Sequence, residues 1–132
     1  MQQSTPQRPG ATDGPGPLSR LERTVLDAIL KGEGGELASL RAQLVRATVL
    51  SRIHSGVGFV TRIAVPDEVP ALAPALDASD APRLRPVLAA HPRLAEQAEF
   101  LLQLRGGRLA VLEAYCYAGG WPADEDEFRM VI

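Results

Sequence analysis

Residues 99–117 read EFLLQLRGGRLAVLEAYCY, and this stretch decides the fold more than any other part of the chain. Two runs of strand-forming residues, 99–104 and 109–117, flank the tetrapeptide RGGR. Paired glycines readily adopt the positive φ angles of a type I′ turn, which joins antiparallel strands through a two-residue loop. The stretch therefore predicts a β-hairpin.

A second hairpin is predicted upstream. Apolar and polar residues alternate over residues 48–54, and β-branched residues become frequent there. Strand composition resumes over 59–65 and stops at a proline. The proline-rich residues 66–86 predict a long surface connection. The two hairpins give four strands, and residues 87–90 and residues 128–132 are each candidates for a further short strand.

Two helices are predicted before the first strand. Ser19-Arg20-Leu21-Glu22 fits the S-x-x-E capping box that begins a helix, and apolar residues then recur at three- and four-residue spacing. Glycines follow Lys31 and end this helix. A second apolar stripe runs over residues 36–47. The sequence therefore predicts an α+β fold, with two N-terminal helices packed on an antiparallel sheet of four to five strands.

The chain of 132 residues predicts one domain over residues 19–132. Residues 1–18 hold four prolines, three glycines and almost no large apolar side chain. Such a segment buries too little surface to offset the entropy lost on ordering. We therefore expect residues 1–18 to form a disordered tail.

The charge pattern argues against two classes of partner. The 14 basic and 16 acidic residues are spread along the chain, so there is no polybasic run to bind nucleic acid. No run of 18 apolar residues occurs and the N-terminus lacks the apolar core of a secretory signal, so we expect no membrane partner and a cytoplasmic location. Thirteen of the basic residues are arginine, and alanine and leucine are abundant, which indicates a GC-rich, bacterial genome.

The sequence favours a non-enzymatic protein and leaves catalysis open. Cys116, His54 and His91 are the only cysteine and histidines, too few for a zinc site, and no cofactor is expected. His54 and Ser55 would point to opposite faces of a regular strand. His91 precedes a proline in a predicted loop, where a solvated side chain is ordinary. The acidic run over residues 124–127 lacks the pattern of a calcium loop and predicts a solvated turn.

Glu113 is the most interesting polar residue of the last hairpin. Alternation places it on one strand face with Tyr115 and Tyr117, and places Cys116 on the opposite, apolar face. If that face is covered, the Glu113 carboxylate must pair, for instance with Arg52 or Arg62, and its pKa would be perturbed. If the face is open, Glu113 is a polar residue on the wet side of an antiparallel sheet.

Trp121 also admits two interpretations. It stands beside a proline in the turn after the hairpin, where it either anchors the turn against the sheet or contacts a partner. The candidate residues for binding a ligand or a partner share a polar or aromatic side chain on or near the predicted hairpins: Thr61, Arg62, Glu113, Tyr115, Tyr117 and Trp121.

Two segments carry a resemblance to other proteins. Residues 56–66 read GVGFVTRIAVP, and residues 107–122 read GRLAVLEAYCYAGGWP. Together they resemble a group of small uncharacterised bacterial proteins with a GxGFxT…VP segment and a GxLxxLExYxY…WP segment. The resemblance spans about residues 36–122 and implies no activity, cofactor or catalytic residue. Most motif positions are turn glycines and sheet residues that a shared fold requires, and their polar members are Thr61, Glu113, Tyr115 and Tyr117.

The sequence therefore predicts a non-enzymatic protein-interaction module whose partner is another protein or a second copy of the chain. Tyrosine and tryptophan, which are enriched at interfaces, gather near one end of the last hairpin. The predicted strand at 128–132 could pair across a dimer edge. An accessory protein for another bacterial protein belongs to the same class. The alternative is a small-ligand protein or enzyme with a pocket near Glu113, partnered by Thr61, Arg62 and Tyr115.

Overall fold

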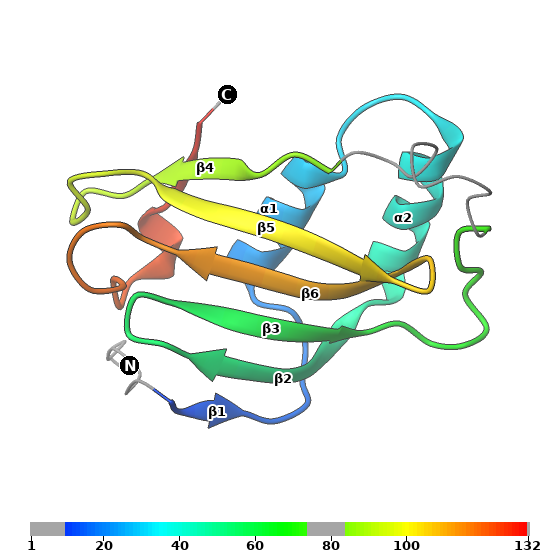
Figure 1. The fold of residues 1–132 in the computed structure, drawn as a ribbon, viewed down its shortest axis with the longest axis horizontal. Coiled ribbons are helices and arrows are strands. Elements are labelled where there is room, and N and C mark those ends of the chain that lie inside the picture. The colour runs from blue at the N-terminus through cyan, green and yellow to red at the C-terminus, as the bar shows by residue number, and fades with distance from the viewer. Residues whose placement is uncertain (1–9, 74–83, 132) are drawn as a thin grey trace.

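The computed structural model describes residues 10–73 and 84–131 and contains one antiparallel sheet with two helices against it (Figure 1). The helices are α1 (Arg20–Ile29) and α2 (Gly35–Arg46), and one turn of 3₁₀ helix, η2, spans Glu125–Glu127. The strands are β1 (Thr12–Asp13), β2 (Thr48–His54), β3 (Gly58–Ala64), β4 (Val87–Ala90), β5 (Ala98–Arg105), β6 (Arg108–Tyr115) and β7 (Arg129–Met130).

The sheet order is β1-β2-β3-β6-β5-β4-β7, so the described residues form seven strands. The α+β class, the two helices and the antiparallel sheet match the prediction, but the expected four to five strands are too few. The strand that the sequence did not reveal is β1, which spans only two residues in the segment expected to be a disordered tail. A strand this short carries almost no alternation. β7, also two residues long, lies within the short strand suggested at 128–132.

Both predicted hairpins are present. β2 pairs with β3, and β5 pairs with β6. Gly106 and Gly107 have φ angles of 57° and 74°, as the turn between β5 and β6 requires. Gly107 is required for a second reason, because a Cβ atom there would collide with the backbone of Leu72. Leu72 belongs to the predicted connection 66–86, of which residues 74–83 lie outside the described residues.

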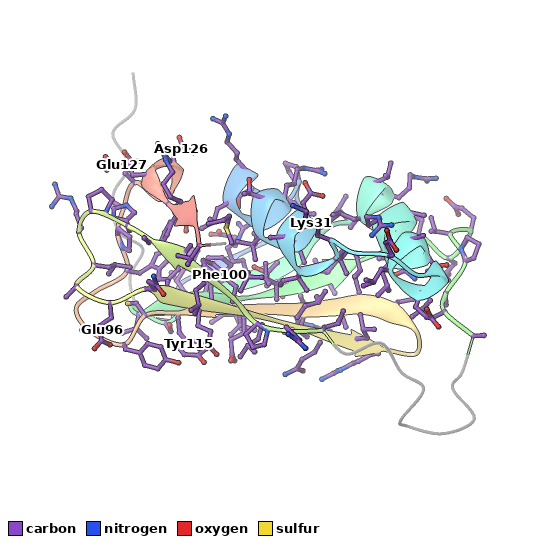
Figure 2. The ribbon with its side chains drawn as sticks, turned by 90° about the horizontal axis from the view of Figure 1, so that it is seen from above. Lys31, Glu96, Phe100, Tyr115, Asp126 and Glu127 are labelled. Atoms are coloured by element: carbon purple, nitrogen blue, oxygen red, sulfur yellow. The ribbon has the colours of Figure 1, made fainter. Side chains whose placement is uncertain are left out.

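The predicted capping box begins α1. The Ser19 hydroxyl accepts a hydrogen bond from the Glu22 backbone N–H at 3.0 Å, and the Ser19 N–H donates to Glu22 Oε1 at 2.7 Å. Beyond this cap, both helices turn apolar side chains to the sheet (Figure 2). The fully buried members of this core include Val25 and Leu26 of α1, Leu40 of α2, and Phe100 and Leu112 of the sheet. The core therefore lies between the helices and one sheet face.

The prediction of a disordered tail over residues 1–18 is wrong for its second half. Residues 10–16, here called the N-terminal strap, lie along the outer edge of β2 and contain β1. The Gly16 N–H donates to the Val49 carbonyl at 3.1 Å, and the Val49 N–H donates back at 2.7 Å. The strap is held mainly by backbone hydrogen bonds to β2 and not by apolar burial. The lack of large apolar side chains therefore did not prevent it from being ordered, contrary to the expectation from the sequence. Residues 1–9 lie outside the described residues.

α2 is fastened to the last hairpin by one fully buried polar side chain, Gln43. Its Nε2 atom donates to the carbonyls of Gly107 at 2.9 Å and Pro70 at 3.3 Å, and its Oε1 atom accepts from the Leu109 N–H at 2.9 Å. One amide thus satisfies backbone groups from two separate segments.

We expect Gln43→Leu to lower the free energy of unfolding by about 1–3 kcal/mol, because it leaves the Leu109 N–H buried without an acceptor. Urea denaturation checks this value. The matched control is Gln103→Leu, since Gln103 is exposed on β5 and should tolerate the same change. Equal losses in both variants would show that the buried amide does not fasten the helix.

Within the described ranges, neither helix has the length and apolar character that a membrane crossing demands.

Candidate functional site

The sheet has one face that no described element covers. Both helices pack on the opposite face, as the edge-on view in Figure 2 shows. The cross-strand register places Val60, Glu113 and Leu101 side by side in one row, and Arg62 and Val111 in the next. Because side chains alternate along a strand, these residues share the uncovered side. We call this surface the open face.

Two tyrosines and a glutamate form a cluster at one end of the open face. Tyr115 and Tyr117 both donate to the Glu99 carboxylate, at 2.7 and 2.8 Å, and their rings meet nearly at right angles with centroids 5.3 Å apart. The neighbouring Tyr117 hydroxyl and the Glu99 carboxylate raise the pKa of Tyr115 well above its ordinary value. Figure 2 shows Tyr115 on the side of the sheet away from the helices.

Sequence reasoning missed Glu99. The two-residue turn at residues 106–107 would by itself pair Glu99 with Ala114. A β-bulge beside Leu104 shifts the register by one residue and brings Glu99 opposite Tyr115 instead. Tyr117 then reaches the same carboxylate from beyond the end of β6. The sequence carries no clear signal for this bulge, so the contact could not be read from the turn alone.

Four of the six candidate residues lie together on the open face: Arg62, Glu113, Tyr115 and Tyr117. Glu113 stands in the row between Val60 and Leu101, and among the described residues it forms no ion pair with Arg52 or Arg62. The open-face interpretation of Glu113 is therefore the one that the structure supports.

Thr61 lies on the helix-covered side instead. It is fully buried, and its hydroxyl donates to the Glu22 carboxylate. Its neighbour Arg62 points the opposite way because the strand is regular at this point. Thr61 and Arg62 therefore lie on opposite faces of the sheet and cannot belong to one site, contrary to the prediction from the sequence.

Trp121 also lies on the helix-covered side. Its ring packs against Phe59, Phe100 and Phe128 with centroid distances of 5.6, 6.0 and 5.0 Å. Its Nε1–H donates to Glu125 Oε2 at 2.8 Å. Trp121 therefore anchors the turn, as the first of its two interpretations predicts, and contact of this residue with a partner stays a prediction. Glu125, expected to be solvated, is drawn inward by this bond, and burial raises its pKa.

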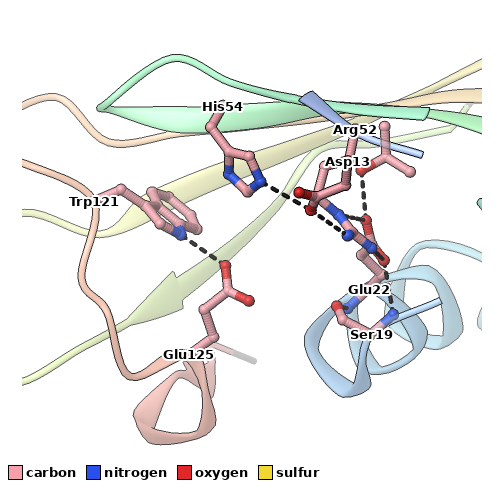
Figure 3. A network of polar contacts seen from close by, with 8 residues as sticks. Asp13, Ser19, Glu22, Arg52, His54, Trp121 and Glu125 are labelled. Carbon is pink, nitrogen blue, oxygen red and sulfur yellow. Dashed lines mark hydrogen bonds and ion pairs between the residues drawn. The ribbon is translucent and has the colours of Figure 1, made fainter. Parts of the chain in front are cut away.

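A polar network on the helix-covered side was not foreseen (Figure 3). Arg52 donates from Nε to Glu22 Oε2 at 3.0 Å, and also forms an ion pair with Glu22 Oε1. Its third nitrogen donates to Asp13 Oδ2 at 2.9 Å, and His54 Nε2 lies 3.0 Å from the same oxygen. Arg52 thus joins the N-terminal strap, α1 and the sheet.

Burial and hydrogen bonding oppose each other at the two carboxylates of the network. Burial acts to raise the pKa of Glu22, but hydrogen bonds from Arg52, the Ser19 N–H and Thr61 outweigh it and hold that pKa below its ordinary value. At Asp13, burial is likewise outweighed by His54 and Arg52, and the pKa is lowered. These carboxylates, and the Arg52 guanidinium whose pKa is raised, are charged partners that stabilise one another.

The network has the geometry of a structural clamp. Its bonds connect the N-terminal strap, α1 and the sheet (Figure 3), and every buried side-chain nitrogen or oxygen atom of the described residues has a hydrogen-bond partner. No nucleophile in the described part of the chain is hydrogen-bonded to His54. The described residues also contain no group of three histidines, cysteines or carboxylates that could hold a metal ion.

The remaining candidates from the sequence are structural. His91 is 4% exposed rather than solvated, with Nε2 2.7 Å from the Asp124 carbonyl and Nδ1 accepting from the Arg93 N–H at 3.0 Å. Cys116 is a buried core residue, as predicted, and burial raises the pKa of its thiol. Both side chains fix local structure.

Two grooves lined by described residues can be compared with the pocket expected near Glu113, and Glu113 lines neither of them. One, of about 410 Å³, lies between α1 and the C-terminal segment and includes Arg20, Glu125 and Arg129. The other, of about 390 Å³, lies beside His91. The pocket expected near Glu113 has no counterpart in either groove, so the ligand-binding alternative gains no support from them.

Comparison of the chain with protein-family models, with curated proteins and with solved structures finds no match. The resemblance to the group with GxGFxT…VP and GxLxxLExYxY…WP segments stays a prediction.

Proposed function

We propose that the chain is a protein-interaction module that binds its partner through the open face of the sheet. The observation that carries the proposal is the one-sided covering of the sheet. Ile53 is 45% exposed, and Val60, Leu101 and Val111 are half-buried on a face that the described elements leave to solvent. These apolar side chains alternate with Glu113, Arg62 and Gln103, and interaction surfaces between separately folded proteins have a similar mixture of apolar and polar groups.

The face is a better binding surface than either edge. The N-terminal strap covers β2, and β7 covers β4, with two paired residues at each edge strand. Short edge strands offer few free backbone groups to another chain. The C-terminal edge expected from residues 128–132 contributes only Arg129–Met130 to the sheet, and Ile132 lies outside the described residues.

Aromatic composition supports the same surface. Tyr115 and Tyr117 stand at one end of the open face, with Tyr117 60% exposed. Tyrosine combines a large contact area with a polar hydroxyl and is enriched at protein interfaces. The proposal includes a bacterial cytoplasm as the site of action, which the composition favours.

Site-specific photo-cross-linking in living cells tests the proposal. We expect a cross-linking amino acid at Leu101 to yield a discrete protein adduct, because this side chain lies at the centre of the open face. The matched control places the same amino acid at Val45, which is 76% exposed on α2. Adducts from position 45 alone, or from neither position, would contradict the proposal.

A further inference from the structure

The open face carries opposite charges at its two ends. Glu99 stands at one end of β5 and Arg105 at the other, six residues away, which is about 20 Å along a strand. Alternation puts both side chains on the open face. In the two middle rows, Glu113 lies toward the acidic end and Arg62 toward the basic end. The face is therefore polarised along the strand direction.

The middle of the same face mixes apolar and polar side chains. Val60, Leu101 and Val111 lie in the two middle rows together with Glu113, Arg62 and Gln103, and Ile53 lies beyond Val60 on β2. Interfaces between separately folded proteins have a similar mixture of apolar and polar surface.

Such a face is complementary to itself. A two-fold axis that lies between two sheets and crosses their strands reverses the strand direction of the second copy. It places Glu99 of one copy against Arg105 of the other, and the reverse contact follows by symmetry. The same rotation sets Arg62 of the second copy above Val60, whose cross-strand neighbour is Glu113. Glu113 itself lies below Val111 of the second copy, with the Arg62 guanidinium of that copy one strand away.

We infer that the occupant of the open face is a second copy of this chain, packed face to face; this rests on the proposed function. Sheets pack face to face with nearly aligned strands about 10 Å apart, a geometry that this symmetry allows. A partner of a single charge sign would match one end of the face and oppose the other.

The size of the face indicates a weak dimer. The four central strands span about 19 Å by 25 Å, so the contact covers roughly 950 Å² counted over both copies. Stable specific interfaces bury about 1,200–2,000 Å² in total, and smaller ones are typical of transient complexes. We therefore expect a dimer that dissociates at about micromolar concentration or above and that weakens as salt rises.

Charge reversal provides the decisive experiment. Glu99→Arg makes both ends of the face basic, and Arg105→Glu makes both ends acidic. Each variant alone should dissociate at least about tenfold more readily than the natural chain, because like charges then face each other. An equimolar mixture of the two should recover the dimer, since every contact is again between opposite charges. Analytical ultracentrifugation from about 1 µM to about 1 mM measures all three.

Two further measurements keep the inference falsifiable. Glu113→Arg and Arg62→Glu form a second charge-reversal pair, to be used if Glu99→Arg disturbs the tyrosines that it contacts. Val45→Arg on α2 should leave association unchanged. A natural chain that stays monomeric throughout, or a mixture that fails to recover the dimer, overturns the inference. An adduct from Leu101 to a different protein, found with such a monomer, would leave the proposed function standing.

Discussion

The variant Arg52→Met is expected to lose about 3–5 kcal/mol of its free energy of unfolding, because it leaves a buried carboxylate without its charged partner. Glu22 is fully buried, and the Arg52 side chain is 17% exposed. Because methionine fills much of the volume of arginine, the decrease in the free energy of unfolding measures the loss of the charge and not the creation of a cavity. Without the guanidinium, Glu22 keeps only the Ser19 N–H and the Thr61 hydroxyl as donors.

The control for this change lies on the neighbouring strand. Arg62 is exposed on the open face and forms none of the ion pairs found among the described residues. Arg62→Met should therefore cost little, and urea denaturation of both variants compares one residue type in two environments. If the two arginines prove equally dispensable, the clamp does not hold the strap, the helix and the sheet together.

The pH dependence of the same variant has a defined sign. In the natural chain the pKa values of Glu22 and Asp13 are lowered, so the stability that they contribute is present above the ordinary carboxyl pKa and lost as the pH falls through the lowered values. In Arg52→Met, burial without a partner should raise the Glu22 pKa instead, and protonation then relieves the buried charge. The stability difference between the two proteins should therefore narrow below about pH 5.

The variant Phe100→Ala is expected to cost about 3–5 kcal/mol, the range for deleting a buried aromatic ring. Phe100 is fully buried and lies edge-on to Trp121 and Phe128, with ring centroids 6.0 Å away in both cases. Its removal leaves a cavity where β5 meets the C-terminal segment. Trp121 is the sole tryptophan, so its fluorescence reports this region directly during denaturation.

Tyr117→Ala is the matched control for Phe100→Ala. It also deletes an aromatic ring, but that ring is 60% exposed and contacts Tyr115 and Glu99 at the surface. The cost should be well below that of the core variant. A similar loss at both positions would mean that the aromatic cluster around Trp121 contributes no special packing energy.

Local signals in the sequence predicted the elements that have strong periodicity or a specific turn. The SxxE box placed the start of α1, and the paired glycines at residues 106–107 placed the β5–β6 hairpin. Alternation placed β2 and β3 within about a residue of their bounds. These features depend on neighbours in sequence, so a single sequence is enough to reveal them.

Features that depend on distant partners could not be predicted in this way. The strap becomes ordered through contacts between Asp13 and Arg52, which are 39 residues apart. Trp121 follows two glycines in a loop, so the alternation of side chains along a strand cannot predict which side of the sheet it packs against. Alternation along β3 shows that Thr61 and Arg62 lie on opposite faces of the sheet. It does not show which of these faces the helices cover. The Glu99–tyrosine cluster needed the register of two strands together.

The N-terminal strap has a consequence for anyone shortening this chain. A cut just before Ser19 appears harmless, because the helix and its cap remain complete. It would nevertheless remove the strap and uncover the backbone of β2 along most of its length. A bare strand of that kind templates aggregation. The strap therefore shields the edge of the sheet, and we expect truncated forms to aggregate as well as to lose the stability contributed by Asp13 and the buried Leu18.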